Sequence, residues 1–300
     1  MFSSSRVIVP SGSFIVDGSC FSLSYAGSGG CIYLYNIISY LTIRNCVFWN
    51  CITGSNCSAI HFESKNGQCI TEKVCAFRCY STKARGHYMF GFFLTKSNLS
   101  NFLCWSSIVQ CAPDASIVRF HSMRFEDGIQ KLKYNNVSSN SLTRYSGISN
   151  NNTKTFELSY STFSNNLDVE YCCLRLDSGT GDRTVSYTNI VNCTQIGSSF
   201  GIILLQFNGE YNITNSNLQK NNAVLFYIIS KSLHVRNCNI DHVTSKLYVG
   251  SASFFSNQMA LIETIGLSHF STFLCQNHQY ETFHNNKPLR EWFFLFVVSL

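Results

Sequence analysis

The sequence has little of what helical proteins and most enzymes show. No stretch sustains the apolar spacing of an amphipathic helix, which argues against an α-helical fold. Only 3 of the 300 residues are proline, which is compatible with many paired strands. Charged residues make up 13% of the chain, with only 16 Asp and Glu, so the groups needed for a carboxylate-based active site are scarce. Ser, Thr and Asn are abundant instead, which suits a polar extracellular surface.

Basic residues lack the clustering of a nucleic-acid-binding surface. The net charge of +6 comes from 22 Lys and Arg that are scattered along the chain. The densest groups are only Lys83–Arg85 and Lys131–Lys133. We therefore expect a solvated surface and no nucleic-acid partner.

Motifs for metal, phosphate or covalent chemistry are also missing. Cys75 and Cys79 have no neighbouring Cys-x-x-Cys pair or suitably spaced His, so a zinc site is not expected. The glycine-rich segment 27–30 lacks the Lys of a phosphate-binding loop. The eight His occur singly, with no Ser or Cys motif nearby to form a nucleophile–base pair. The sequence thus predicts no catalytic residue, no metal ligand and no cofactor.

What the chain does contain is a degenerate repeat, in which an apolar residue is followed three positions later by Asn or Cys. The repeat returns every 22 to 31 residues, and this kind of periodicity indicates a solenoid. The key apolar positions are predicted at Phe48, Phe77, Ile108, Val137, Phe163, Ile190, Leu218 and Ile240.

Three flanking positions extend the repeat. The residue two before the key position is small or short in every coil. The residue five before it is aliphatic, except in the second coil, which has Glu72 there. The residue three after it is Cys or Asn in most coils, although in the second coil this position slips by one, to Cys79.

Alternating polar and apolar residues precede the corners, as in segments 41–45 and 233–237, and a second apolar run follows most of them. Each coil therefore supplies at least two short strands. We predict an all-β, right-handed parallel β-helix solenoid of roughly nine or ten coils. A leucine-rich-repeat solenoid is the alternative, and it ranks second because the Leu-x-x-Leu-x-Leu pattern does not precede the Asn.

No linker-like break interrupts the repeat, so one elongated domain is expected. Residues 1–28 are predicted to form an N-terminal cap and the first strands, residues 29–286 the β-helix repeats, and residues 287–300 an apolar C-terminal segment. The end of that segment, Trp292–Leu300, is either a cap on the last coil or the start of a truncated membrane anchor. Met1–Ser13 lacks the apolar run of an ordinary signal peptide.

The 15 Cys fall mainly at repeat corners. Cys46 with Cys75, and Cys51 with Cys79, are predicted at equivalent places in successive coils, about 4.8 Å apart and within disulfide range. Disulfides between coils are one interpretation. The favoured one treats Cys as a small buried filler that interchanges with Asn, Ser and Thr. An inward amide ladder is then expected from Asn140, Asn166 and Asn221.

The repeat resembles the polymorphic-membrane-protein type, in which Phe-x-x-Asn and Gly-Gly-Ala-Ile motifs lie on a right-handed, pectate-lyase-like β-helix. Phe163–Asn166 and Phe283–Asn286 match the first motif, and Gly29–Ile32 is close to the second. Similar Cys-rich versions are numerous on the surfaces of parasitic protists. The resemblance implies a non-enzymatic, adhesin-like surface or secreted protein.

Right-handed β-helices also include pectate lyases and polygalacturonases, so a polysaccharide lyase or glycoside hydrolase acting on an acidic polysaccharide is the alternative function. The Asp-Asp, Asn-Thr-Asp and Gly-His-Gly motifs that the polygalacturonase resemblance requires are absent. The best remaining acidic group combines Asp168, Asp177 and Asp182 with Arg175 and Arg183. We expect this group to form a solvated loop between strands rather than a catalytic site.

The expected location is the cell surface or the extracellular space. The expected partner is a host-cell or extracellular glycan or protein ligand, with membrane attachment through sequence beyond Leu300 as a further interpretation. No residue identifies that ligand, and a degenerate family member without a binding role fits the same sequence.

Overall fold

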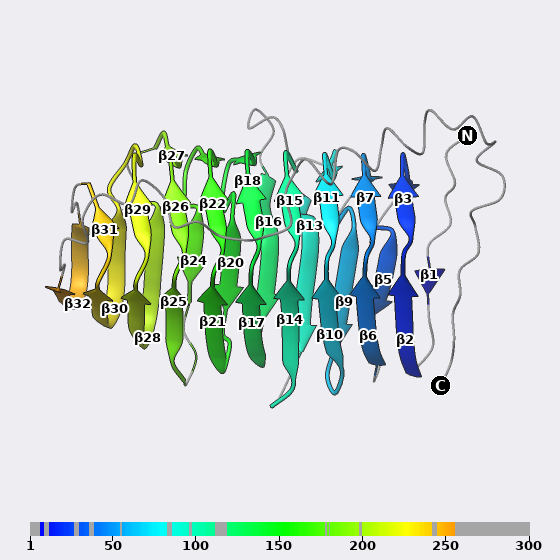
Figure 1. Ribbon diagram of the computed structural model, residues 1–300, viewed down its shortest axis with the longest axis horizontal. Helices are drawn as coiled ribbons and strands as arrows, with labels where there is room; N and C mark the ends of the chain where they lie inside the picture. Colours follow the sequence, from blue (N-terminus) through cyan, green and yellow to red (C-terminus); the bar gives the residue numbers. More distant parts are fainter. Residues whose placement is uncertain are drawn as a thin grey trace.

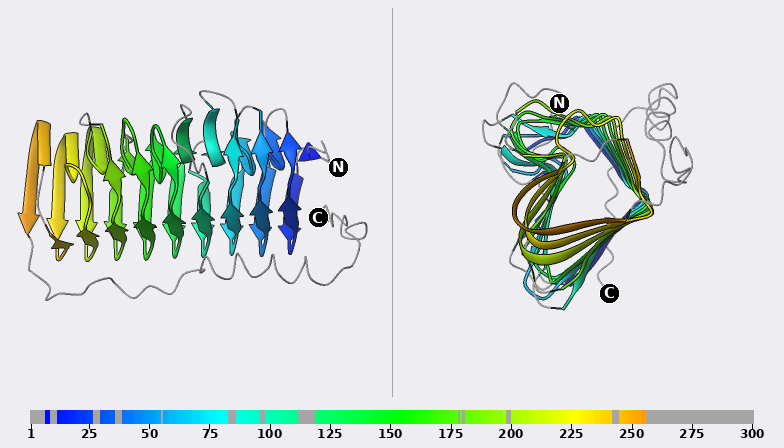
Figure 2. Two further views of the ribbon diagram at one scale, coloured as in Figure 1. Left: turned by 90° about the horizontal axis from the view of Figure 1, so that it is seen from above. Right: turned by 90° about the vertical axis from the view of Figure 1, so that its left-hand side faces the viewer.

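The computed structural model shows parallel strands wound into a solenoid. It describes residues 7–8, 12–26, 30–35, 39–54, 56–82, 86–95, 98–111, 119–177, 179, 181–197, 200–241 and 245–255. Every strand pairing within these residues is parallel, and none of them forms a helix. Successive coils stack along one axis (Figure 1) and superimpose into a three-sided outline when viewed down it (Figure 2). The chain is therefore an all-β parallel β-solenoid, or β-helix.

Two of the three faces belong to one 17-stranded sheet. The first face contains β1 (Val7–Ile8), β5 (Ile32–Tyr35), β9 (Ile60–Ser64), β13 (Gly86–Thr95), β16 (Arg119–Glu126), β20 (Ile148–Asn151) and β24 (Leu174–Leu176). The second face contains β2 (Gly12–Asp17), β6 (Ser39–Arg44), β10 (Gln68–Glu72), β14 (Ser100–Cys104), β17 (Ile129–Lys133), β21 (Thr155–Ser159) and β25 (Arg183–Ser186). Three long strands run across both faces: β28 (Ile203–Thr214), β30 (Phe226–Arg236) and β32 (Ser245–Phe255).

The third face is a nine-stranded sheet. Its strands are β3 (Cys20–Ser22), β7 (Val47–Trp49), β11 (Cys75–Phe77), β15 (Ser107–Val109), β18 (Asn136–Ser138), β22 (Thr162–Ser164), β26 (Asn189–Val191), β29 (Asn217–Gln219) and β31 (Asn239–Ile240). Short strands beside it form two three-stranded sheets: β4 (Tyr25–Ala26), β8 (Ile52–Thr53) and β12 (Tyr80–Ser81), then β19 (Ser141–Leu142), β23 (Leu167–Asp168) and β27 (Thr194–Gln195).

The coils are not equivalent, and the prediction of nine or ten is too high for complete turns. The solenoid has about six turns, and six coils carry a short fourth strand among the described residues. In the coils of β28 and β30 the strand continues through the corner between the first and second faces, which shortens the coil. With strands on three faces and no helix in the described coils, the leucine-rich-repeat alternative is wrong.

The key apolar residues lie opposite one another on the third face, and one prediction is wrong by a single place. Ala76, not Phe77, pairs with Phe48 and Ile108. Side chains alternate across a strand, so Ala76 packs in the core and Phe77 points outward. The other predicted key residues are in register: Phe48, Ile108, Val137, Phe163, Ile190, Leu218 and Ile240.

The corrected register removes both irregularities of the second coil. Thr71, which is buried, takes the position that the sequence prediction gave to Glu72. Cys79 falls three residues after the key residue, without a slip. Cys75 lies one place away from the equivalent of Cys46, which is a free thiol. The less favoured interpretation, in which a disulfide joins Cys46 and Cys75, is therefore wrong.

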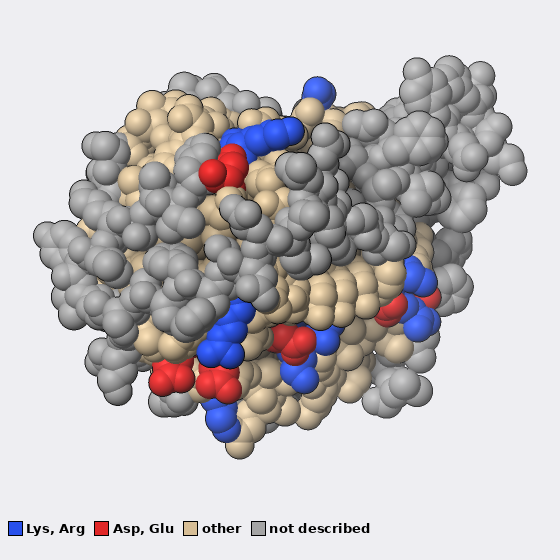
Figure 3. All heavy atoms as spheres, turned by 60° about the vertical axis from the view of Figure 1, so that its left-hand side comes forward, with Lys and Arg blue, Asp and Glu red and all other residues tan. Residues whose placement is uncertain are grey.

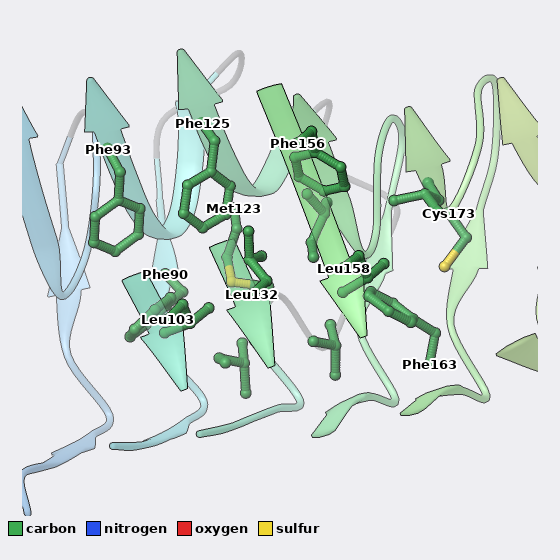
Figure 4. Packing of buried hydrophobic residues seen from close by; sticks show 14 of the residues in the cluster. Phe90, Phe93, Leu103, Met123, Phe125, Leu132, Phe156, Leu158, Phe163 and Cys173 are labelled. Carbon is green, nitrogen blue, oxygen red and sulfur yellow. The ribbon is translucent and has the colours of Figure 1, made fainter. Parts of the chain in front are cut away.

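The interior is filled by side chains from all three faces. Figure 4 shows Phe93 of β13 and Phe125 of β16 directed into it, beside Leu132 and Phe163. The rings of Phe93 and Phe125 stack at 5.0 Å because the two residues are paired in adjacent coils. Because equivalent residues of successive coils lie opposite one another, an apolar position of the repeat forms a continuous column of packed side chains in the core.

The Asn or Cys three residues after the key position closes each corner from inside. Asn166 accepts a hydrogen bond from the Asn140 backbone N–H at 3.1 Å and donates one to the Val137 carbonyl at 2.8 Å. Asn140 and Asn221 make the same two types of bond. The predicted amide ladder is confirmed, and Cys51 and Cys79 fill the equivalent place as free, buried thiols.

Replacing Asn166 with Ala leaves a buried N–H and a buried carbonyl without partners. Each such group costs about 1–3 kcal/mol, so we expect the free energy of unfolding to fall by about 2–5 kcal/mol in urea titrations. Ser164→Ala, on the outward side of the same coil, is the control and should change it by less than about 0.5 kcal/mol. Equal effects of the two substitutions would contradict the ladder as a source of stability.

Candidate functional site

Two of the three acidic residues singled out in the sequence are buried. Asp168 and Asp177 have 1% and 0% of their surface exposed, whereas Asp182 is exposed. Gly179, between Asp177 and Asp182, lies against the preceding coil, since a Cβ there would lie 1.6 Å from the Thr153 carbonyl oxygen. The prediction of a solvated loop is therefore wrong for Asp168 and Asp177.

Asp177 is tied to neighbouring guanidinium groups. Arg175, two residues earlier, forms an ion pair with it and also donates a hydrogen bond to the Tyr145 hydroxyl at 2.8 Å. Burial raises the pKa of Asp177, and the positive charges of Arg175, Arg124 and Arg183 partly offset that effect. Asp177 is thus a covered carboxylate held by basic side chains, which leaves it no approach to a substrate.

Arg183 has a structural role at the same turn. It is fully buried, and its guanidinium donates to the backbone carbonyls of Asp177 at 2.9 Å and Thr153 at 3.0 Å. One side chain thus supplies hydrogen-bond donors to buried backbone carbonyls of two coils. Arg183 therefore anchors the turn rather than contributing a reactive cation.

Asp168 closes the corner of the preceding coil. Its carboxylate accepts hydrogen bonds from the backbone N–H of Ser146 at 2.8 Å and from the Ser146 hydroxyl. Burial raises the pKa of Asp168 to about 7, although these hydrogen bonds act in the opposite direction. Asp168 and Asp177 lie in different environments, and each is accounted for by the packing of its own coil.

A Cys–His–Glu arrangement, missed in the sequence, lies at the edge of the first face. The Sγ of Cys57 lies 3.4 Å from Nδ1 of His61, and Nε2 of His61 lies 3.8 Å from Glu63. This is the order of a nucleophile, a base and an orienting carboxylate. The spacing Cys-x-x-x-His-x-Glu of residues 57–63 could have suggested it, although the sequence predicted no nucleophile–base pair.

Burial argues against catalysis by this group. Cys57 has no exposed surface and packs against Phe92 and Leu94. Burial raises the pKa of the Cys57 thiol well above its usual range, so the unreactive thiol predominates near neutral pH. The arrangement lacks the exposed thiolate that nucleophilic catalysis needs.

An outward column of stacked aromatic rings lies at the corner between the second and third faces. Ring centroids lie 4.3 Å apart for Trp105 and Tyr134, 5.1 Å for Tyr134 and Tyr160, and 4.9 Å for Tyr160 and Tyr187. We call these four residues the aromatic corner column. No hydrogen bond from their side chains exists within the described residues, and Tyr187 is 40% exposed. The column was not predicted, because nothing in the repeat distinguishes these outward rings from the aromatic residues of the core.

The backbone at this column is unfavourable for large side chains. All four residues have positive φ, between 49° and 58°, a region that bulky residues rarely adopt. Other coils place Gly18, Asn45, Lys73, Asn215 and Asn237 at the same corner. Gly and Asn tolerate this conformation best, so the winding of the chain does not require aromatic residues there. Such strain, kept in four consecutive coils, points to a role of these outward rings, of which Tyr187 is exposed and the other three are half-buried.

Several charged residues on the rod form pairs of opposite sign. In the view of Figure 3, Lys and Arg side chains lie beside Asp and Glu side chains. On the second face, Lys133 and Glu157 are 2.7 Å apart, and Arg44 and Asp17 are 2.9 Å apart.

Below about pH 7 the protonation of Asp168 should stabilise the fold. The native state holds this proton between about pH 4 and 7, whereas the unfolded chain releases it near pH 4, so the free energy of unfolding falls as pH rises through this window. In urea titrations, the free energy of unfolding should fall less between pH 4.5 and pH 7.5 in Asp168→Asn than in the unsubstituted protein. The Asn side chain keeps an acceptor for the Ser146 N–H but does not titrate. The same pH dependence in both proteins would contradict the assignment.

The thiol of Cys57 should resist alkylation in the folded protein. We expect iodoacetamide at pH 8 to modify the exposed Cys20 first and to reach Cys57 only after denaturation, as measured by peptide mass spectrometry. The physical reason is that burial removes both access and thiolate character. Modification of native Cys57 as fast as Cys20 would restore the catalytic interpretation.

Among the described residues, no group of His, Cys, Asp and Glu has the arrangement of a metal site, and no helix is long and apolar enough to cross a membrane. The apolar segment 287–300 and the Phe283–Asn286 motif lie outside the described residues. The chain matches no protein-family model, no curated protein and no solved structure.

Proposed function

We propose that this chain is a non-enzymatic surface or secreted β-helix that binds a glycan or protein ligand in the manner of an adhesin. The aromatic corner column carries the proposal, because it combines an outward position, stacked geometry and an unfavourable backbone conformation. The resemblance to polymorphic-membrane-protein repeats on a pectate-lyase-like helix belongs to the same proposal, as does location outside the cell.

The column is suited to binding because its rings are already held in place. Each interior ring is stacked on both sides, so little side-chain freedom is lost when a ligand contacts its outer edge. Tyr and Trp combine a large apolar area with a polar group, and they are enriched where proteins bind ligands tightly. The hydroxyls of Tyr134, Tyr160 and Tyr187 follow the rod at intervals of one coil.

The acidic and thiol groups favour this proposal over the lyase or hydrolase alternative. A glycosidase needs two carboxylates that reach the scissile bond. Asp177 and Asp168 are covered, and Glu126 forms an ion pair with Arg124. Cys57 is buried beside His61. Each of these groups has a partner within its own coil or the adjacent one.

Replacing all four aromatic residues of the column with Asn should abolish adhesion and preserve the fold. Asn occupies this corner in other coils, so the loss of ring stacking, about 0.5–1.5 kcal/mol for each pair, is offset by relief of backbone strain. The measurement is retention of purified protein on cultured cells and on immobilised glycans and matrix proteins, with circular dichroism as the fold check.

The matched control changes the other corner with positive φ, by Arg78→Asn, Gln110→Asn, Ser139→Asn and Lys220→Asn. Adhesion should survive these four substitutions. Undiminished adhesion of the column variant would contradict the proposal. Release of unsaturated sugars or new reducing ends from pectin-like polymers, lost in Asp177→Asn, would favour the enzymatic alternative.

A further inference from the structure

The aromatic corner column ends in a step at Tyr187. The inner face of the Tyr187 ring stacks on Tyr160 with an interplanar angle of 0°. The next coil has Asn215 at the same corner, since the Tyr187 N–H bonds to the carbonyl of Thr214. No described ring stacks on the other face, and 40% of the residue is exposed. Tyr187 is thus the last ring of the column, and its outer face extends past the smaller side chain of Asn215 without a described ring upon it, which is the sense in which we call that face free.

The surface in front of that free face is neutral and polar. Asn212 and Thr214 of β28 point outward, because Tyr211 and Ile213 between them are fully buried. Together with Asn215 they offer amide and hydroxyl groups that both donate and accept hydrogen bonds. A ligand that lies against the Tyr187 ring therefore meets a floor suited to hydroxyl groups.

A cation borders the far side of this floor. Arg236 of β30 is exposed and pairs in register with Thr214, one coil beyond it. No acidic side chain of the described residues forms an ion pair with Arg236. The rows of Tyr187 and Arg236 are two coils apart, about 10 Å along the axis. Ring face, hydrogen-bonding floor and guanidinium thus follow one another in three successive coils.

We propose that this step binds a carboxylated pyranose sugar, an inference that rests on the proposed function and names the ligand class of its site. The C–H face of the sugar packs on the free face of Tyr187, because the ring face is negative and aliphatic C–H groups are weakly positive. Asn212, Thr214 and Asn215 bind the hydroxyls. Arg236 binds the carboxylate in a charge-assisted pair.

The step at Tyr187 is a better sugar site than the outward edges of the other rings in the column. Tyr134 and Tyr160 are stacked on both sides, so they present only ring edges and hydroxyls. A neutral sugar would leave Arg236 unused, and an aromatic cation would be repelled by it. A carboxylated sugar contacts the Tyr187 ring, the polar floor and Arg236 at the same time.

Titration calorimetry with trigalacturonate, sialyllactose and neutral maltotriose tests the inference. We expect the two acidic sugars to bind more tightly than maltotriose, and to weaken when salt is raised. Preference for trigalacturonate or for sialyllactose distinguishes a uronic acid from a sialic acid as the source of the carboxylate. Failure of both acidic sugars to bind the native protein would overturn the inference.

Three variants locate the site. Arg236→Gln should weaken the binding of the two acidic sugars at least tenfold and leave the affinity for maltotriose unchanged. Tyr187→Asn should weaken all three sugars. Asn215→Tyr should also weaken them, since the new ring extends the stack over the free face. Arg44→Gln, which changes an exposed Arg at the equivalent outward position of an earlier coil, is the control. Equal affinity in Arg236→Gln and Arg44→Gln would overturn the inference.

The outcome also separates this inference from the proposed function. Adhesion that depends on Tyr134 and Tyr160 while no acidic sugar binds would reject the sugar site and keep the adhesin-like role. If the unsubstituted protein shows neither adhesion nor binding of acidic sugars, both the sugar site and the adhesin-like role would be rejected.

Discussion

The parallel register between coils is the constraint on which this structure depends. A residue must lie opposite its equivalent in the next coil, because backbone hydrogen bonds join the coils at every rung. Phe163 therefore stacks between Val137 and Ile190, and Asn166 closes the corner for Asn140. Insertions are accommodated between strands or as register shifts within the longer strands β13, β28, β30 and β32, which explains why coil length varies while the corner positions do not.

The same register determines the outer surface. Side chains at one outward position form a row with a spacing of about 4.8 Å, so four aromatic residues at one corner necessarily become a column. Opposite charges in such rows pair with each other, as Lys133 and Glu157 do. Function on this fold is therefore expected in rows that depart from pairing, and the aromatic corner column, which ends in a step at Tyr187, is such a departure.

The repeat predicted the fold class and seven of the eight key apolar positions, because inward side chains in a β-solenoid are strongly constrained. It failed at Phe77, where the larger residue points outward and Ala76 fills the core. It also failed at Asp177, since a pattern of strands does not show which loops fold back over a face. The predicted domain boundaries and the right-handed winding stay predictions.

The candidate site was largely beyond sequence reasoning. Trp105, Tyr134, Tyr160 and Tyr187 are 26 to 29 residues apart, and their alignment appears only when the corner with positive φ is known. The sequence shows that Cys57 and His61 are close, but it does not show the burial that removes the reactivity of the Cys57 thiol. Outward residues lack the periodic constraint that makes the core predictable.

Cross-linking along the aromatic corner column tests the register most directly. In a background with Cys20→Ser, Tyr160→Cys with Tyr187→Cys places two thiols on adjacent coils, about 4.8 Å apart and within disulfide range. Tyr134→Cys with Tyr187→Cys places them two coils apart, which is too far. Mild oxidation followed by peptide mapping should give a disulfide in the first pair alone. A disulfide in the second pair, or in neither, would contradict the account.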